Sequence, residues 1–127
     1  MPILGIDLGT TNSVAAVDQQ VRAVSDAGCV ALPSAVAFLP NGSVRVGEVA
    51  RRRRAIDSAN TIFSSKRIIG RRYDASETRN FMTRYPFEIV EIEGGWPAFR
   101  TRAGDISPSR IASHVLGGLL ERIDLDP

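Results

Sequence analysis

The chain has 127 residues, the size of one globular domain, and its 43% hydrophobic content is enough to form a core. Its formal net charge of +2 is too small to indicate nucleic acid or a membrane surface as a partner. The single cysteine, Cys29, excludes an internal disulfide and predicts a buried, unreactive thiol. The longest apolar-rich region, residues 29–39, is interrupted by Pro33, is too short to cross a bilayer, and we expect no signal sequence. We therefore expect a soluble cytoplasmic protein.

The first predicted element is a β-hairpin over residues 3–18. Ile6 and Leu8 alternate with small or polar residues, which is typical of a strand with one buried face. Residues 14–17 form a short apolar run that can pair with this strand. The loop between the two strands, residues 9–13, has the sequence GTTNS.

This loop combines many hydrogen-bond donors with little bulk. Gly9 allows backbone conformations in which successive N–H groups turn toward one point, a concavity that suits phosphate oxygens. Asp7 would repel phosphates unless Mg²⁺ bridges them to its carboxylate. The loop therefore predicts a nucleotide-phosphate and Mg²⁺ site, formed by a hairpin because no Walker motif is present; the alternative is a simple hairpin connection. The loop side chains add three hydroxyls and an amide, from Thr10, Thr11, Asn12 and Ser13.

Short strands and a helix are predicted next. Residues 48–56 read as a helix that carries Arg51 to Arg54. At about 100° per residue these arginines point in four directions, so they should not form one patch. Without interleaved aromatic residues, a solvated helix face is favoured over nucleic-acid binding. The strands before this helix are expected at residues 21–24, with a turn at 25–28, and at 35–39 and 44–47, which form a hairpin around the turn at 40–43.

A second helix is predicted over residues 61–69, with Asn60 as its N-cap and Gly70 at its end. This segment carries Lys66, the single lysine among the sixteen lysine and arginine residues. A compact ammonium in a chain that otherwise uses arginine indicates a task unsuited to a planar guanidinium, such as approaching a phosphate and its attacking water. The alternative is an ordinary solvated charge.

The last part of the chain is predicted to form a hairpin and a helix. Residues 74–85 show no clean period and are expected to be a loop or short helix. Residues 88–93 and 98–102 should pair around a glycine turn. Ser107 is the expected N-cap of the final helix, with Pro108 as its first residue.

His114 is the single histidine and lies on the predicted final helix. No carboxylate or cysteine stands at ligand spacing from it, so a packed or surface histidine is favoured over a metal ligand or a catalytic base.

The segment GIDLGTTNS, residues 5–13, resembles the first phosphate loop of the DnaK-type chaperones, the seventy-kilodalton heat-shock family within the actin and sugar-kinase superfamily of ATPases. SSKRIIGRRY, residues 64–73, is similar to the family segment whose lysine reaches the γ-phosphate region. The resemblance covers nearly the whole chain and includes LPSAVAF, VRVGEVARRR and PFEIVEIEGGWPAF.

This resemblance implies an α/β, actin-like ATPase (ribonuclease H-like) fold. The chain would form part of lobe I, with β-hairpins and two or three helices. Residues 1–35 and 107–127 would belong to the inner subdomain, and residues 36–106 would form the outer subdomain. The rest of the ATPase domain and the peptide-binding domain would be absent from this chain.

The resemblance also implies roles for individual residues. Asp7 would hold Mg²⁺ through water, and Lys66 would orient the attacking water and stabilise the charge that develops on the transferred phosphoryl group. Catalysis would involve Lys66 and Thr10. The β- and γ-phosphates of ATP or ADP would be held by Gly9, Thr10, Thr11 and Asn12, with Lys66 beside them.

The function implied by the resemblance is an ATP-dependent stress chaperone that couples hydrolysis to binding and release of unfolded polypeptide, with a J-domain co-chaperone and a nucleotide-exchange factor. The 127-residue chain alone should be inactive. A sugar or acetate kinase of the same superfamily and a nucleic-acid-binding module that uses the arginine helix remain alternatives. Within the chaperones, DSANTIFSSKR is similar to the branch that assists iron–sulfur cluster assembly, and general stress chaperones also fit.

Overall fold

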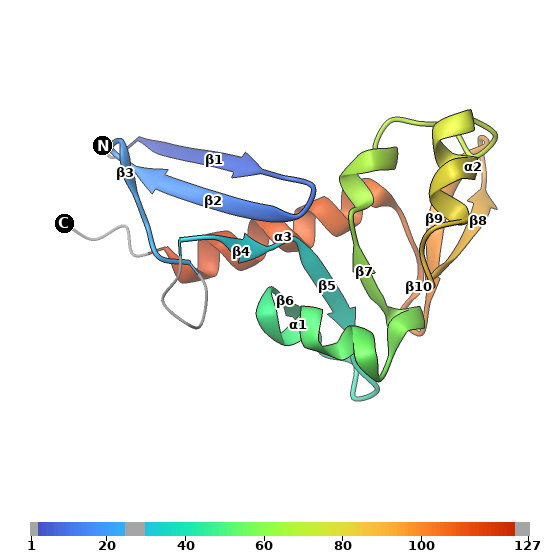
Figure 1. The fold of residues 1–127 in the computed structure, drawn as a ribbon, viewed down its shortest axis with the longest axis horizontal. Helices are drawn as coiled ribbons and strands as arrows, with labels where there is room; N and C mark the ends of the chain where they lie inside the picture. The colour runs from blue at the N-terminus through green and yellow to red at the C-terminus, as the bar shows by residue number, and fades with distance from the viewer. Residues whose placement is uncertain (1–2, 25–29, 124–127) are drawn as a thin grey trace.

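The computed structural model describes residues 3–24 and 30–123, and its architecture is mixed α/β, as expected. The described strands form three antiparallel sheets (Figure 1). In the first sheet β2 pairs with β1 on one side and with β3 and β4 on the other. Its strands span Leu4–Leu8 (β1), Asn12–Val17 (β2), Gln20–Val21 (β3) and Leu32–Pro33 (β4).

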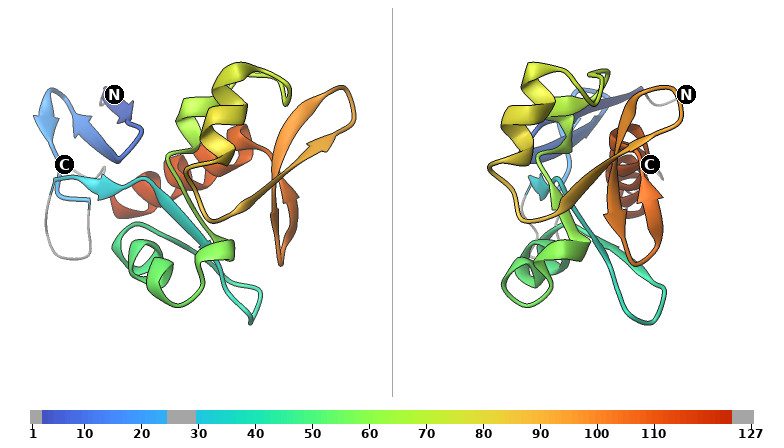
Figure 2. Two further views of the ribbon diagram at one scale, coloured as in Figure 1. Left: turned by 45° about the vertical axis from the view of Figure 1, so that its right-hand side comes forward. Right: turned by 90° about the vertical axis from the view of Figure 1, so that its right-hand side faces the viewer.

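The other two sheets have three strands each. Strand β5 lies between β6 and β7, and β9 lies between β8 and β10. The sheet of β8 to β10 stands at the end of the molecule away from the first hairpin (Figure 2). These strands span Ala35–Phe38 (β5), Val44–Val46 (β6), Thr61–Phe63 (β7), Glu88–Ile92 (β8), Trp96–Thr101 (β9) and Gly104–Ile106 (β10).

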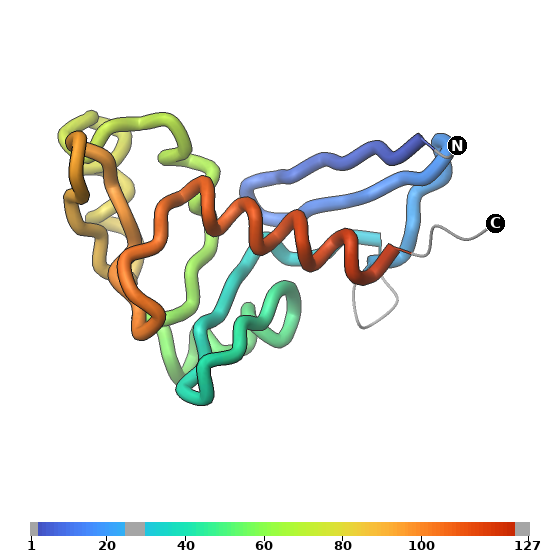
Figure 3. Tube along the Cα trace, turned by 180° about the vertical axis from the view of Figure 1, so that it is seen from behind, coloured from blue at the N-terminus to red at the C-terminus, as the bar shows by residue number. Residues whose placement is uncertain are grey.

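The longest helix, α3, runs along the length of the molecule and connects its two ends (Figure 3). Ile111 and Val115 belong to a core cluster shared with the second and third sheets. Leu119, one turn further on, packs with Ala15 and Leu32 of the first sheet. The helices are α1 (Glu48–Arg52), α2 (Ser76–Met82) and α3 (Pro108–Arg122), with short 3₁₀ turns η1 (Arg53–Ala55), η2 (Ser58–Asn60) and η3 (Ser65–Ile68).

The three hairpins predicted from the sequence are present. The first pairs Leu8 with Ser13 across its loop, and the other two are β5 with β6 and β8 with β9. The final helix also begins as predicted, because the Ser107 hydroxyl accepts a hydrogen bond from the Arg110 amide at 3.1 Å. Residues 74–85 contain the short helix α2.

The helix predicted over residues 61–69 is wrong. Its first three residues form strand β7, in which Ile62 lies opposite Val36 of β5 and is fully buried. The run of β-branched and aromatic residues suits a strand, and pairing with β5 overrides the helical pattern. Ser64 then takes a left-handed conformation with φ 60°, which separates β7 from η3. Asn60 is not an N-cap; its amide donates to Asp57 and accepts from the backbone of Arg102.

The arginine segment also differs from the prediction. The helix α1 ends at Arg52, and the chain continues as the 3₁₀ turn η1. Arg51, Arg52 and Arg54 line one shallow surface hollow, and the guanidinium of Arg54 lies 5.0 Å from the centroid of the Phe63 ring. Arg53 instead pairs with Asp57 at 3.4 Å. The tighter turn after Arg52 changes the angular spacing on which the prediction relied.

Three smaller differences concern the ends of elements. Strand β3 covers residues 20–21 instead of 21–24, and strands β4 and β10 were not predicted as separate elements. The predicted turn at residues 25–28 and the predicted burial of Cys29 lie outside the described residues. Within residues 3–24 and 30–123, no helix is long and apolar enough to span a membrane.

Candidate functional site

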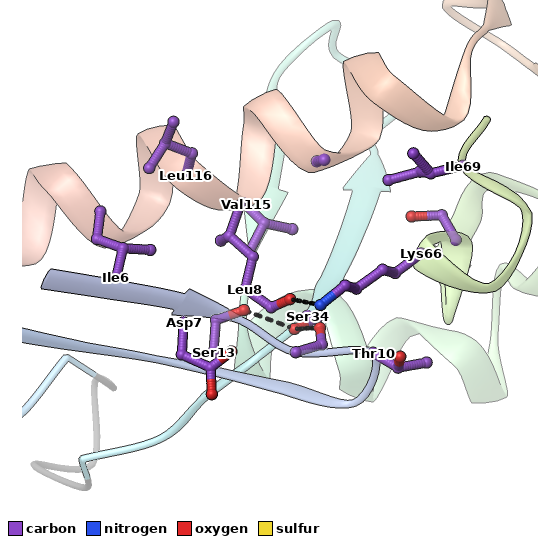
Figure 4. A pocket seen from close by; sticks show the side chains of 13 residues that line it. Ile6, Asp7, Leu8, Thr10, Ser13, Ser34, Lys66, Ile69, Val115 and Leu116 are labelled. Atoms are coloured by element: carbon purple, nitrogen blue, oxygen red, sulfur yellow. Dashed lines mark hydrogen bonds between the residues drawn. The ribbon is translucent and has the colours of Figure 1, made fainter.

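A cavity of about 550 Å³ lies between the first hairpin, η3 and α3 (Figure 4). One wall is apolar and comes from β1, α3 and the end of η3. The other is polar and comes from β1, the hairpin loop, β2, the residue after β4, and η3. The apolar wall contains Ile6, Leu8, Ile69, Ala112, Val115 and Leu116, and the polar wall contains Asp7, Gly9, Thr10, Ser13, Ser34, Ser65 and Lys66.

Lys66 reaches this cavity from η3. Ser65 and Ile68 are buried on either side of it and fix the turn against the core, while Lys66 itself is exposed. Its Nζ atom donates a hydrogen bond to the carbonyl oxygen of Leu8 at 2.7 Å. The ammonium therefore lies at the end of β1, where the hairpin loop begins.

The hairpin loop requires glycine at its first position. Leu8 and Ser13 are the last paired residues, so the chain reverses over residues 9–12. A Cβ atom on Gly9 would clash with the carbonyl oxygen of Asn12. Thr10 lines the cavity beside Gly9, and Thr11 and Asn12 are exposed. The tight loop leaves the backbone accessible at a point where a bulkier residue would block it.

The structure brings together four of the six residues to which the resemblance gave roles. Asp7, Gly9, Thr10 and Lys66 line one cavity, although Lys66 is far from the others in sequence. Thr11 and Asn12 lie on the same loop but are not part of the lining.

Ser13 does not contribute its hydroxyl to the loop surface as the sequence reading supposed. It is fully buried, and its Oγ lies 2.8 Å from the Oγ of Ser34. Ser34 was not singled out from the sequence, although its hydroxyl donates to the carbonyl oxygen of Gly9 at 2.8 Å. One signal in the sequence could have identified Ser34. It lies between Pro33 and the apolar run of β5, where a buried polar side chain needs a hydrogen-bond partner.

The carboxylate of Asp7 could bind Mg²⁺ together with phosphates, but the described residues of the site form no complete set of protein ligands for the ion. No group of three or more histidine, cysteine, aspartate or glutamate residues that could hold a metal occurs in the described part of the chain. Mg²⁺ is commonly held by one or two carboxylates together with waters and substrate phosphates. Asp7, exposed and beside the loop, fits that mode.

His114 lies outside this cavity. Its ring packs edge-on against Phe38, with centroids 5.7 Å apart, so of the packed or surface histidine predicted from the sequence it is a packed one. Burial lowers the pKa of its imidazole, and the positive charge of Arg110 lowers this pKa further.

The chain is similar to known chaperones along almost its whole length. A family model described as Hsp70 protein matches residues 3–125. Identity is 38% over 122 residues to the mitochondrial heat shock protein SSC3 of Saccharomyces cerevisiae, covering 94% of this chain and 19% of that protein. It is 40% over 122 residues to the mitochondrial heat shock 70 kDa protein of Dictyostelium discoideum, covering 94% and 18%. It is 44% over 124 residues to chaperone protein DnaK of Akkermansia muciniphila, covering 92% and 19%.

The chain thus spans about a fifth of the length of these relatives. A match over residues 3–125 leaves almost no part of the chain unaccounted for. The chain belongs to the Hsp70 family.

Proposed function

We propose that this chain forms part of the nucleotide-binding region of an ATP-dependent chaperone, and that the cavity beside the hairpin loop receives the phosphates of ATP or ADP. The contact between Lys66 and the end of β1 carries this proposal. It places the single lysine of the chain next to Gly9 and Thr10 in one cavity. A cation, a glycine-containing loop and a hydroxyl in one place suit phosphate oxygens.

The residues divide into binding and catalytic roles. The backbone of residues 9–12 would hold the β- and γ-phosphates. The hydroxyl of Thr10 would donate to a γ-phosphate oxygen. Asp7 would hold Mg²⁺ through water, and the ion would neutralise charge on the phosphates when bound.

Lys66 would stabilise charge on the transferred phosphoryl group and orient the attacking water. Its ammonium has three N–H groups, and its one hydrogen bond within the described structure, to Leu8, leaves donors for a phosphate and a water. Hydrolysis of ATP depends mainly on such positioning and charge stabilisation.

The wider proposals rest on family membership. The chain would form part of an actin-like ATPase fold, with residues 1–35 and 107–127 in an inner subdomain and residues 36–106 in an outer one. The whole protein would couple hydrolysis to binding and release of unfolded polypeptide, with a J-domain co-chaperone and a nucleotide-exchange factor. A cytoplasmic location stays a prediction; two of the relatives carry mitochondrial names.

Membership of the Hsp70 family favours the chaperone over a sugar or acetate kinase. Nucleic-acid binding is a second candidate function. Arg51, Arg52 and Arg54 line one surface hollow, here called the arginine hollow, that could attract an anionic partner. That rival predicts salt-sensitive binding of DNA or RNA, which gel-shift assays at increasing salt would detect.

The test of the proposal uses Lys66→Ala in a longer protein that contains this chain and hydrolyses ATP. We expect the hydrolysis rate to fall by about a hundredfold or more, a typical cost of removing one group that stabilises transition-state charge. Binding of ATP should be retained, because the loop backbone is unchanged. Arg67→Ala is the matched control, since Arg67 is the next residue, exposed, and outside the cavity lining. An ordinary hydrolysis rate for Lys66→Ala would refute the role of Lys66.

A further inference from the structure

A single residue, Ser34, holds two carbonyl groups of the hairpin loop. Its backbone N–H donates to the carbonyl oxygen of Thr11 at 2.8 Å. Its hydroxyl donates to the carbonyl oxygen of Gly9, also at 2.8 Å. These two carbonyls stand on either side of Thr10. Ser34 therefore fixes the loop from the junction between β4 and β5, more than twenty residues further along the chain.

The hydrogen bond from Ser34 to Gly9 determines which serine donates in the hydrogen bond between Ser13 and Ser34. The hydroxyl of Ser34 has one proton, which it gives to Gly9. In the contact between Ser13 and Ser34 the proton must therefore come from Ser13. The two serines form a relay in which Ser13 donates to Ser34 and Ser34 donates to the loop. Both are buried, which shields these bonds from competition with water.

The two hydrogen bonds that Ser34 donates to the loop carbonyls determine the direction in which the loop N–H groups point. In a trans peptide group the N–H and C=O point in opposite directions, and the described residues contain no cis bond. Because the carbonyls of Gly9 and Thr11 face Ser34, the N–H groups of Thr10 and Asn12 face away from it. The N–H of Thr10 donates to no other residue in the described part of the chain.

We propose that Ser34 is a positioning residue for phosphate binding. It holds two partially negative carbonyl oxygens toward itself, and so leaves the amides of Thr10 and Asn12 on the opposite side of the loop, where they can donate to phosphate oxygens. This inference rests on the proposed nucleotide site. Ser34 donates to the carbonyls of Gly9 and Thr11, Ser13 supports its orientation, and its side chain also lines the cavity.

The test compares variants of the 127-residue chain titrated with Mg–ATP and followed by amide NMR. Ser34→Ala should weaken Mg–ATP binding by about tenfold, the effect of losing one hydrogen bond of ordinary strength. Ser34→Thr keeps the hydroxyl and should recover most of the affinity. Ser113→Ala is the matched control, since Ser113 is an exposed serine on α3 whose hydroxyl donates to the carbonyl oxygen of Ser109. Its affinity should equal that of the wild type.

A double variant, Ser13→Ala with Ser34→Ala, separates positioning from general stability. Ser34→Ala alone leaves the hydroxyl of Ser13 buried without an acceptor, which destabilises the fold. The double variant removes this unpaired donor, so its stability toward urea should recover in part. Its affinity for Mg–ATP should stay as low as that of Ser34→Ala, because the bond to Gly9 is still missing. An affinity that recovers along with stability would overturn the proposal.

NMR spectra recorded without nucleotide test the effect of Ser34 on the loop independently of the proposed nucleotide site. In Ser34→Ala the carbonyl-carbon shift of Gly9 and the amide shift of Thr10 should change, and relaxation should show more motion at Thr10. If wild-type loop amides do not respond to Mg–ATP, the proposed nucleotide site fails, whatever Ser34 does. If they respond, but Ser34→Ala leaves the loop signals or the affinity unchanged, the positioning role of Ser34 is refuted.

Discussion

The Nζ atom of Lys66 lies 2.7 Å from the carbonyl oxygen of Leu8, a residue 58 positions earlier in the chain. Leu8 is the last residue of β1, and the hairpin loop begins immediately after it. The hydrogen bond therefore joins η3 to the base of the loop. It brings the one ammonium side chain of the protein to the loop that contains Thr10, close to Asp7 near the end of β1.

The tight turn at Gly9 gives a first prediction. A side chain there would clash with the carbonyl oxygen of Asn12, so Gly9→Ala should lower the free energy of unfolding by about 1–3 kcal/mol. The control is Gly117→Ala, because a Cβ on this helical glycine meets nothing within 4 Å. That variant should be neutral or more stable by up to about 1 kcal/mol. Urea unfolding of both variants checks the prediction, and equal effects would contradict it.

A second prediction concerns Asp57, which joins η1 and η2 to the end of β9. Its carboxylate lies 2.7 Å from the Nη2 atom of Arg102 and 3.4 Å from that of Arg53. The hydrogen bond from Asn60 is the main reason that the pKa of Asp57 is lowered; burial opposes this, and the two guanidiniums add to it. A lowered carboxyl pKa contributes stability above the ordinary aspartate range, and this contribution is lost as the pH falls through the lowered pKa.

We therefore expect Asp57→Asn to lose about 1–2 kcal/mol of unfolding free energy near neutral pH, with a smaller loss in acid. Asp105→Asn is the matched control, because Asp105 forms only an exposed pair with Arg100 and should change stability by less than about 0.5 kcal/mol. Urea unfolding near neutral pH and near about pH 3.5 makes the comparison. A loss for Asp57→Asn that does not shrink in acid would contradict the assignment.

His114 gives a third prediction through its lowered pKa. Burial against Phe38 and the charge of Arg110 both disfavour the imidazolium in the folded chain. The unfolded chain therefore takes up this proton at a higher pH, so the contribution of His114 to stability declines as the pH falls below about 6.5. An NMR titration of this single histidine should give a pKa below the ordinary value.

Arg110→Gln should raise the pKa of His114 in part, since burial remains the larger cause. Arg79→Gln, which removes an exposed charge on α2, serves as the control and should leave the pKa of His114 unchanged. A pKa at or above the ordinary histidine value in the wild type would show that the imidazole is not packed as described.

The sequence predicted the elements whose signals are local. The first hairpin follows from the alternation around Ile6 and Leu8, and the final helix follows from the N-cap Ser107 and the proline after it. The proximity of Lys66 to the loop was expected from its being the single lysine and from the family resemblance. No local pattern reports a contact between residues so far apart in the chain.

The sequence failed where tertiary contacts decide the conformation. Residues 61–63 form a strand because β5 is available to pair with them, and only the fold supplies that neighbour. The role of Ser34 was invisible for the same reason, since its partners Ser13 and Gly9 lie more than twenty residues earlier. The predicted helix over residues 48–56 ends at Arg52, and residue propensities do not mark the change to a 3₁₀ turn at Arg53.

The most direct test of the account is a titration of the isotope-labelled chain with Mg–ATP, followed by amide NMR spectra. The account predicts that the signals of Gly9, Thr10 and Thr11 shift together along one binding curve, even if affinity is weak. The arginine hollow supplies an internal comparison, because free ATP attracted only by charge would shift Arg51, Arg52 and Arg54 instead. Shifts confined to those arginines, or no shifts at the loop, would contradict the central claim that the hairpin loop receives the phosphates of ATP.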